Sequence, residues 1–364
     1  MVEQEFKPAV HCIVHTPLAY LCACEYLAHA GARERYLCVI ATSRASAEQI
    51  RELASRDEWT RIFFLREGRG PGTLEKILSL ARLVKARMRF GALLARIPAG
   101  DRVILSHLNN PYSRFVLQRR HESGGKVVIV DDGTTTLEEY GTLARSGRLR
   151  ADDGRPRHSG IHARLEAQLF SSRDICSAEV AFFSFWPLQT GDRPHAPEIL
   201  QQNSFPVLKA GLRPQDSLPC VYFVGQPFVR RELVNEKEYG DIVRRIAEQY
   251  RQQGLDFIYH PHRNEDPRLI AGFCEVRRNL KPFELELLEV GSLPRIVAGF
   301  YSACILTSLY LFGERMKYEL FWGFDRVSPE RGASPLIAEA IEAEAQHSPV
   351  LTIDRSLGLG STLC

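Results

Sequence analysis

Two adjacent carboxylates follow an apolar run in the first half of the 364-residue chain, in the sequence Lys126-Val-Val-Ile-Val-Asp-Asp-Gly. The β-branched run predicts a buried strand, with Asp131 and Asp132 at its carboxyl end and Gly133 in the turn. Successive strand residues point to opposite faces, so one carboxylate is expected to face a site, where it could take a proton from a hydroxyl group. The sequence leaves open which one does so, and an Asp-Gly turn with a helix cap would look the same.

A second group of reactive side chains follows the strand-like run Asp256-Phe-Ile-Tyr-His-Pro-His-Arg. When protonated, His260 or His262 could neutralise a departing phosphate, and Pro261 fixes the backbone between them. Arg263 could make forked contacts with a phosphate or a carboxylate. The plain alternative is a polar turn whose histidines only satisfy backbone groups.

Two weaker signals follow in the same half of the chain. Glu284, in Lys281-Pro-Phe-Glu, could bind ribose hydroxyls, although an acidic residue after Pro282 is also usual in the first turn of a helix. Ser302, in Gly299-Phe-Tyr-Ser-Ala-Cys, could present its hydroxyl and backbone N–H groups to a phosphate. The motifs of NAD-binding, P-loop and α/β-hydrolase proteins do not occur in the sequence.

The elements that would position these residues alternate between strand and helix patterns. The predicted strands are Ala9–His15, Tyr36–Ala41, Arg61–Leu65, Arg102–Ser106, Lys126–Asp131, Glu179–Trp186, Cys220–Val224, Asp256–Tyr259, Ala303–Thr307 and Val350–Ile353. The predicted helices are Leu18–His29, Ala45–Ser55, Leu74–Ile97, Arg230–Gln253, Pro282–Val290 and Pro335–Ala345. Apolar strands separated by helices predict parallel sheets covered on both faces.

The pattern weakens between about residues 190 and 218, which are rich in Pro, Gln and Asn, and then restarts. We therefore expect an α/β fold of two Rossmann-like, doubly wound domains, residues 1–215 and 216–364, that face a central cleft. The last helix could pack back on the first domain. Ligands bind beyond the carboxyl ends of strands in such folds, which is where the residues above lie.

Composition limits the classes of partner. Hydrophobic residues make up 45% of the chain and charged residues 25%, and a net charge of +3 gives no support for nucleic-acid binding. Nine cysteines, mostly in apolar runs and without a zinc-ligand spacing, indicate a reduced protein without a metal site. The acidic start and the absence of a run of about 18–20 apolar residues predict a cytoplasmic protein.

Basic residues form two clusters, which are either solvated surface or sites that attract an acidic acceptor or an anionic membrane. One cluster lies in the predicted helix 74–97 and would place the protein at the inner face of the membrane. The other lies in the polar stretch 145–157. The clusters consist of Lys76, Arg82, Lys85, Arg87, Arg89 and Arg96, and of Arg145, Arg148, Arg150, Arg155 and Arg157.

Taken in order, the motifs resemble those of the bacterial sialyltransferases, including polysialyltransferases and lipooligosaccharide enzymes. That family has a D/E-D/E-G motif, an H-P motif, a P-F-E-x-L segment and a serine motif, matched here by Asp131–Gly133, His260-Pro261, Pro282–Glu284 and Ser302. Val14-His-Thr-Pro-Leu and Val224-Gly-Gln-Pro-Phe are similar to further family segments. The resemblance touches most of the chain, but only in short islands.

The resemblance implies a GT-B fold and single displacement with inversion, without an obligatory cofactor or metal. An Asp would deprotonate the acceptor, with the polysialyltransferase pattern favouring Asp131, and His260 would stabilise the leaving CMP. The spacing to Glu284 favours His260 over His262, and Ala303 stands where many members have a second serine, so Thr307 could supply that contact. The residues expected to bind the CMP-sialic acid donor are Gly133, Gln226, Pro261, His262, Arg263, Glu284, Ser302 and Thr307.

On the acceptor side we expect contacts from Thr16, Asn109, Arg145 and Arg148. The acceptor would be a surface glycan, a lipid-linked glycan or an anionic polysialic chain. Three rival hypotheses remain: a transferase for Kdo or another CMP-activated acidic sugar, a nucleotide-sugar epimerase that uses a UDP-type donor, and an inactive scaffold that binds nucleotide or glycan without turnover. The sequence does not define the linkage or the oligomeric state.

Overall fold

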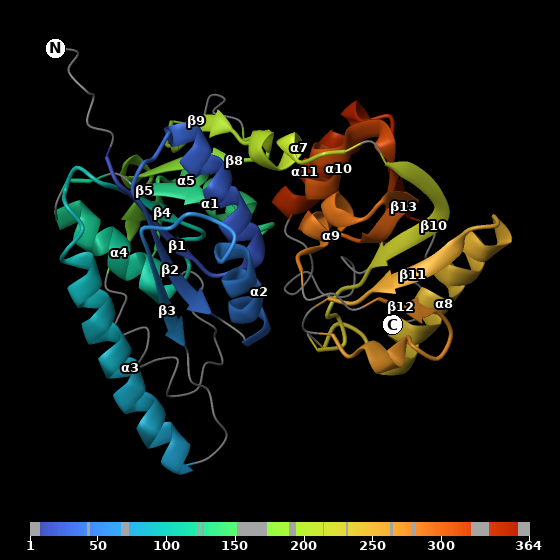
Figure 1. The fold of residues 1–364 in the computed structure, drawn as a ribbon, viewed down its shortest axis with the longest axis horizontal. Helices are drawn as coiled ribbons and strands as arrows, with labels where there is room; N and C mark the ends of the chain where they lie inside the picture. Colours follow the sequence, from blue (N-terminus) through green and yellow to red (C-terminus); the bar gives the residue numbers. More distant parts are fainter. Residues whose placement is uncertain are drawn as a thin grey trace. The chain divides into compact units, whose positions relative to one another are not determined.

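The chain forms two compact units, Met1–Val207 and Leu208–Cys364, and each contains its own parallel β-sheet (Figure 1). The computed structural model describes residues 8–41, 44–66, 73–122, 124–125, 127–150, 173–188, 194–213, 215–230, 232–262, 265–277, 281–321 and 335–355. The expected division into an acceptor side and a donor side stays a prediction.

The described residues of the first domain form a seven-stranded parallel sheet in the order β3-β2-β1-β4-β5-β8-β9. The chain moves outward from β1 in one direction and then returns to β4 on the other side, so the strand order reverses between β1 and β4. Its strands are β1 (Val10–Val14), β2 (Arg35–Ala41), β3 (Arg61–Arg66), β4 (Arg102–Leu105), β5 (Val127–Val130), β8 (Val180–Ser184) and β9 (Glu198–Gln202).

Helices connect these strands in the Rossmann manner. They are α1 (Pro17–Ala30), α2 (Arg44–Ala54), α3 (Thr73–Leu94), α4 (Pro111–Glu122) and α5 (Thr135–Ser146). A short antiparallel pair, β6 (Arg148–Leu149) and β7 (Ile175–Cys176), and a 3-10 turn, η1 (Ser177–Glu179), follow α5. Helix α1 has clear local signals at both ends, because Thr16 caps its first turn and Gly31 adopts a left-handed φ of 59° at its end.

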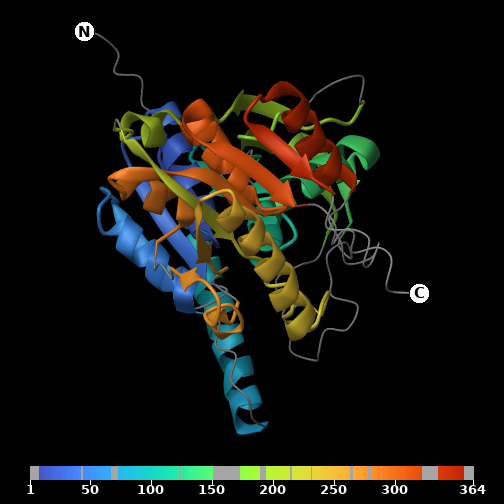
Figure 2. The same ribbon diagram turned by 90° about the vertical axis from the view of Figure 1, so that its right-hand side faces the viewer.

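The second domain repeats this plan with six parallel strands in the order β12-β11-β10-β13-β14-β15, so its strand order reverses between β10 and β13. The strands are β10 (Asp216–Val224), β11 (Asp256–His260), β12 (Glu275–Val276), β13 (Ser292–Phe300), β14 (Lys317–Phe321) and β15 (Leu351–Asp354). The helices are α7 (Pro206–Ala210), α8 (Glu236–Gln252), α9 (Phe283–Glu289), α10 (Ala303–Phe312) and α11 (Pro335–His347), with 3-10 turns η2 (Pro267–Leu269) and η3 (Gly313–Arg315). Helix α8 lies beside β11 (Figure 2).

The predicted α/β class with two Rossmann-like domains, as in the GT-B type, is confirmed, because both main sheets are parallel. The expected central cleft between the domains stays a prediction. Helix α8 begins at Glu236 and not at Arg230, because Asn235 caps its first turn by accepting a hydrogen bond from the Glu238 N–H. The stretch expected to be a linker contains β9 and α7.

One element was predicted wrongly, because the run from Ala303 is helix α10 and not a strand. A buried apolar run fits either element, and here its local hydrogen bonds favour the helix. Ser302 caps the first turn, and Ser308 donates to the Cys304 carbonyl, 2.6 Å away. Ser302 is therefore located at the N-terminal end of a helix.

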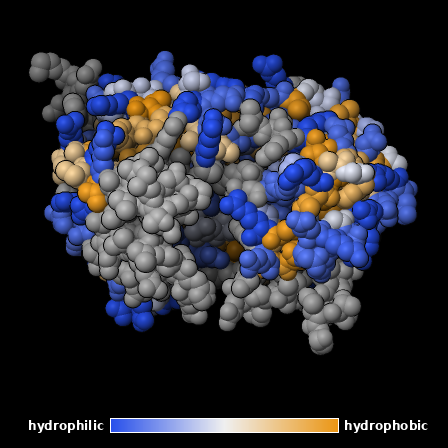
Figure 3. Space-filling model, turned by 90° about the horizontal axis from the view of Figure 1, so that it is seen from below, coloured by the Kyte–Doolittle hydropathy of each residue, from blue (hydrophilic) through white to orange (hydrophobic). Residues whose placement is uncertain are grey.

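The basic helix α3 extends past the sheet of the first domain (Figures 1 and 2). Val84 and Met88, one helical turn apart, are exposed beside the exposed Lys85 and Arg89. Elsewhere, on the face shown in Figure 3, hydrophobic residues form small groups among hydrophilic ones. None of the described helices has the length and apolar character needed to span a membrane, and peripheral membrane contact stays a prediction.

Close packing between β10 and β13 leaves no room for a side chain at Gly299, which pairs with Val224. A Cβ atom there would lie 2.6 Å from the Val224 carbonyl oxygen. We expect Gly299→Ala to lower the free energy of unfolding by about 1–3 kcal/mol in urea denaturation followed by circular dichroism. Gly272→Ala, where nothing lies within 4 Å of a Cβ, should change it by no more than about 0.5 kcal/mol. Equal losses in both variants would refute the steric explanation.

Candidate functional site

Two histidines lie where the strand order of the first domain reverses. His15 follows β1 and His107 follows β4, and these two strands are neighbours. Nδ1 of His15 lies 2.9 Å from the Ser106 hydroxyl oxygen, which links the two strand ends. Ligands of doubly wound sheets bind beyond the strand ends at this point of reversal.

Burial disfavours the charged form of both imidazoles. Burial lowers the pKa of His15 well below its ordinary value, and the nearby His107, with its ring centre 4.8 Å away, lowers it further. Burial also lowers the pKa of His107, while the charge of Asp132 acts in the opposite direction. Nε2 of His15 and Nδ1 of His107 are buried and have no hydrogen-bond partner of ordinary length among the described residues, although Nδ1 of His107 lies 3.9 Å from a carboxylate oxygen of Glu139. Unsatisfied buried nitrogens of this kind are typical of ligand sites.

The two adjacent aspartates have different surroundings. Asp131 is fully buried, and its carboxylate accepts hydrogen bonds from the Ser184 hydroxyl at 2.6 Å and from the Phe185 N–H at 2.7 Å. Burial raises its pKa to about 7, although these hydrogen bonds oppose the rise. Asp131 therefore links the end of β5 to the end of β8.

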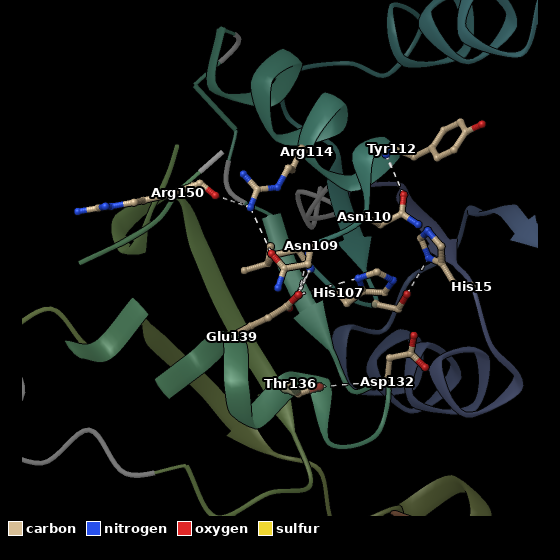
Figure 4. A network of polar contacts seen from close by, with 12 residues as sticks. His15, His107, Asn109, Asn110, Tyr112, Arg114, Asp132, Thr136, Glu139 and Arg150 are labelled. Carbon is tan, nitrogen blue, oxygen red and sulfur yellow. Dashed lines mark hydrogen bonds and ion pairs between the residues drawn. The ribbon is translucent and has the colours of Figure 1, made fainter. Parts of the chain in front are cut away.

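Asp132 is only partly buried, and its side chain points toward the ring of His107 (Figure 4). Its carboxylate accepts a hydrogen bond from the hydroxyl of Thr16, the capping residue of α1. Its backbone N–H donates to the Thr136 hydroxyl oxygen, 3.2 Å away. Of the two aspartates, Asp132 is therefore the one that lies with the strand-end residues His107 and Thr16.

The turn after Asp132 depends on Gly133, which has a φ of 75° that other residues rarely adopt. The Gly133 carbonyl accepts a hydrogen bond from the indole N–H of Trp186, 3.1 Å away. This contact fixes the turn that leads into α5. Gly133 therefore lies in the first domain next to Asp132, and its expected role in donor binding stays a prediction.

A third buried acid orients the loop after β4. The Glu139 carboxylate accepts hydrogen bonds of 2.8 Å from the backbone N–H groups of Leu108 and Asn109 (Figure 4). Burial raises the pKa of Glu139 to about 8. Asn109 in turn accepts a hydrogen bond from the guanidinium group of Arg114, 3.2 Å away. The loop that carries His107 is thus held by groups on α4 and α5.

Sequence reasoning missed His15, His107 and Glu139 as parts of this site. Position gave the signal for the two histidines, because His107 directly follows a predicted strand, and His15 ends another predicted strand and directly precedes Thr16. Nothing in the sequence marked Glu139, which is one of two consecutive acids in a helix. Only burial distinguishes it from the exposed Glu138.

The arginines expected to bind an acceptor lie away from these residues. Arg145 is exposed in the last turn of α5, and Arg148 is exposed in β6. Asp132 precedes the opposite end of this 12-residue helix. At a rise of 1.5 Å per residue, Arg145 is roughly 15 Å along the helix from that end. Arg155, Arg157 and Arg263 lie outside the described residues.

In the second domain, a glycine turn and a helix start follow β10 and β13, the strands at which its order reverses. Gly225 follows β10, and its N–H donates to the His260 carbonyl, 2.9 Å away. A Cβ at this position would lie 2.1 Å from the Tyr259 hydroxyl oxygen, so only glycine fits without displacement. Gln226 is partly exposed, and its N–H donates to the Tyr239 hydroxyl. Ser302 caps α10 after β13.

One buried acid fixes both the turn at Gln226 and the loop after β11. The Tyr259 hydroxyl donates to Glu265 and lies 2.8 Å from the Tyr239 hydroxyl. The other Glu265 oxygen accepts a hydrogen bond of 3.0 Å from the His262 N–H. Burial raises the pKa of Glu265 to about 7. His262 and Pro261 are partly exposed in this loop.

His260 is almost fully buried at the end of β11. Its Nδ1 lies 3.3 Å from a carboxylate oxygen of Glu286, and its Nε2 is buried with no hydrogen-bond partner among the described residues. The ring packs against Tyr222 and Phe283, with ring-centre distances of 4.6 and 5.3 Å. These contacts fix the orientation of the imidazole.

The P-F-E segment and the serine motif meet between α9 and α10. The Thr307 hydroxyl donates to Glu284, 2.6 Å away, and both side chains are buried. Burial raises the pKa of Glu284. Ser302 caps the same helix five residues before Thr307, roughly one and a half turns away, so the predicted donor-binding residues Glu284 and Thr307 are in contact and Ser302 lies at the start of the same helix. Such a group can bind polar ligand atoms through a carboxylate, a hydroxyl and helix N–H groups.

Within the described ranges, His, Cys, Asp and Glu form no group of three or more that could hold a metal ion. The chemistry that these residues can support themselves is proton transfer by Asp132, and charge stabilisation or proton donation by His260. The expectation that the reaction needs no metal stays a prediction.

Comparison with known proteins gives similarity at the level of solved structures. No protein-family model matches the chain, and no curated protein matches it by sequence. UDP-GlcNAc 2-epimerase from Methanocaldococcus jannaschii is 11% identical, with 95% of this chain and 88% of that chain covered and a TM-score of 0.48. MurG from Acinetobacter baumannii is 10% identical, with 95% and 86% covered and a TM-score of 0.42.

A UDP-glucosyltransferase from Polygonum tinctorium is 13% identical, with 96% of this chain and 85% of that chain covered and a TM-score of 0.49. These similarities are weak over the whole chain, and the assignment of the fold rests on the strand order of the two sheets. The resemblance to sialyltransferases rests on the four sequence motifs.

The buried carboxyl of Glu139 predicts a pH dependence of stability. With a folded-state pKa of about 8, above the unfolded value of about 4.3, its contribution is complete below the unfolded value and is lost as the pH rises through about 8. From this group alone, wild type should lose at most about 1.4 kcal/mol per pH unit between about pH 5 and pH 8. Glu139→Gln should reduce the slope, which thermal unfolding at several pH values would measure.

Glu138→Gln is the matched control for this prediction, because it makes the same change at the preceding, exposed position of α5. It leaves the buried carboxyls of Asp131 and Glu139 in place and should follow the wild-type slope. A wild-type slope in Glu139→Gln would show that Glu139 does not hold its proton in the folded protein.

Proposed function

We propose that the chain is an inverting glycosyltransferase that moves sialic acid from CMP-sialic acid to a hydroxyl group of a glycan acceptor. The observation that carries the proposal is the meeting of three motifs at α9. Glu284 on this helix accepts a hydrogen bond from Thr307 of the serine-motif helix. Glu286, two residues further along, lies against His260 of the H-P motif. Residues up to 47 positions apart thus form one group. These residues belong to motifs that occur along the chain in the same order as in the sialyltransferases.

The second domain would bind the donor. Ser302 and the first N–H groups of α10 suit a phosphate, because the positive end of a helix dipole attracts an anion there. The Glu284 carboxylate suits the two ribose hydroxyls, each of which can donate a hydrogen bond to it. Gln226 lies in the turn beside the H-P loop and would complete this surface.

The first domain would supply the base, and we assign that role to Asp132. Its carboxylate is partly exposed and receives a hydrogen bond from Thr16, which orients it. Asp131 is fully buried, and both of its oxygens already accept hydrogen bonds within the fold. A base must reach the hydroxyl proton that it removes, so Asp132 fits the role better.

In the proposed step, the acceptor oxygen bonds to the anomeric carbon on the face opposite the phosphate. The bond between that carbon and the phosphate oxygen breaks, and its electron pair leaves with CMP. Asp132 takes the acceptor proton, and His260 donates a hydrogen bond or its proton to the departing phosphate oxygen. Positive charge develops on the sugar in such a transition state, as in glycoside cleavage.

The first test is CMP release from CMP-sialic acid, with and without a panel of glycan acceptors. We expect wild type to release CMP, and His260→Ala and Asp132→Asn to lower kcat by about 10²–10⁴-fold, the usual contribution of a general acid or base. Asp131→Asn should retain kcat within about tenfold at a temperature at which it stays folded. Loss of activity in Asp131→Asn with full activity in Asp132→Asn would exchange the two roles.

The same assay separates the rival functions. Turnover of CMP-Kdo alone would make the chain a Kdo transferase, since the CMP-binding residues would serve either sugar. Conversion of a UDP-sugar without an acceptor would indicate an epimerase. Binding of CMP without turnover of any donor would indicate an inactive scaffold. A fall in acceptor affinity at high salt would support an anionic acceptor bound by Arg145 and Arg148.

A second test concerns the ribose contact of Glu284. Glu284→Gln should weaken CMP binding by about tenfold in isothermal titration calorimetry, which corresponds to about 1.4 kcal/mol. It should weaken binding of 2′-deoxy-CMP less, because that ligand lacks one of the hydroxyls. Thr307→Val is the control, since it removes the hydroxyl partner of Glu284 and keeps the carboxylate. Equal losses for both nucleotides would argue against a ribose contact.

A further inference from the structure

We propose that Glu286 is a positioning residue that fixes the orientation and the tautomer of His260. The role of His260 at the departing phosphate rests on the function proposed above, whereas the coupling of Glu286 to His260 is a property of the protein alone. Nothing in the sequence motifs singled out Glu286, which stands at the last position of the P-F-E-x-L segment, where the pattern has Leu.

The geometry of α9 separates the tasks of its two buried acids. Glu284 and Glu286 are two residues apart, so their side chains leave the helix roughly 200° apart. Glu284 therefore turns toward Thr307 on α10, and Glu286 turns toward His260 on β11. One short helix thus connects the two motifs through carboxylates that point in nearly opposite directions.

Burial makes the contact between Glu286 and His260 significant. The side chains are only 5% and 6% exposed, and the closest N···O distance is 3.3 Å. A buried carboxylate is costly unless a proton-bearing group lies against it, and Nδ1 of His260 is such a group when it carries its proton. The contact therefore favours the proton on Nδ1.

The other groups against the imidazole fix its plane. Tyr222 and Phe283 both pack against it, and the Tyr222 hydroxyl accepts a hydrogen bond of 2.6 Å from Arg277. With the ring fixed and Nδ1 facing Glu286, Nε2 is the ring nitrogen that has no hydrogen-bond partner among the described residues. Nε2 is then the nitrogen that meets a ligand.

This arrangement has a chemical consequence for group transfer. A histidine that must bear positive charge as a phosphate departs is helped by a carboxylate behind it, which stabilises the imidazolium and holds its orientation. Glu286 would touch neither the donor nor the acceptor and would act only through His260.

Two variants separate orientation from charge. Glu286→Gln keeps a carbonyl oxygen for the Nδ1 proton but loses the negative charge, and Glu286→Leu loses both. Glu289→Gln is the matched control, because it makes the same substitution on the same helix at an exposed position. Circular dichroism would show whether each variant is folded.

The primary measurement is the ¹⁵N NMR spectrum of histidine-labelled protein without substrate, with His260 identified by the signal that disappears in His260→Gln. We expect wild type, Glu286→Gln and Glu289→Gln to keep the proton on Nδ1, and Glu286→Leu to show a mixture of tautomers. An unchanged His260 signal in Glu286→Leu would overturn the proposal. If Glu286→Leu does not fold, a wild-type signal with the proton on Nε2 would overturn it equally.

CMP release gives the second measurement. We expect Glu286→Gln to lower kcat by about 10–100-fold and to change the KM for the donor by less than about threefold, because the contact acts on the departing charge. Wild-type kcat in Glu286→Gln would overturn the role in catalysis. If wild type turns over no donor, the proposed function fails, and the NMR result still decides whether Glu286 fixes the tautomer of His260.

Discussion

The direction of the strands is the constraint on which the rest of the structure depends. All strands of each main sheet are parallel, so the residues that follow them collect along one edge. In both domains the strand order also reverses, between β1 and β4 and between β10 and β13, so the chain leaves that edge in opposite directions and room remains there for polar groups. His15, His107 and Asp132 in one domain, and Gln226, His260 and Ser302 in the other, follow from this single arrangement.

Buried acids then determine the shape of each edge. Asp131, Glu139 and Glu265 each accept hydrogen bonds from backbone N–H groups in loops that follow strands. Burial raises the pKa of all three, so each carboxyl is a less stable anion than it would be in water. Burial of these carboxyls therefore lowers the free energy of unfolding near neutral pH. Their hydrogen bonds give the loops that carry the candidate site defined conformations.

The fold was accessible from the sequence because its signals are local: apolar runs of strand length, helical patterns between them and a weakly patterned stretch between the domains. The serine-motif helix was missed because the apolar run after Ser302 fits a strand as well as a helix, and the decisive cap is a single side chain. For the site, motif order pointed to His260 and Glu284, whose roles stay predictions. Glu139 and Glu286 could not be found this way, since their importance comes from burial against residues distant in the sequence.

The Tyr239, Tyr259 and Glu265 network has a mechanical consequence. Gln226 and His262 belong to loops after different strands. The Gln226 N–H donates to the Tyr239 hydroxyl and the His262 N–H donates to Glu265, and these two acceptors belong to the same buried network. The two loops therefore cannot be repositioned independently. A ligand that displaces one of these loops would also strain the hydrogen bonds that hold the other, so the two loops would move together.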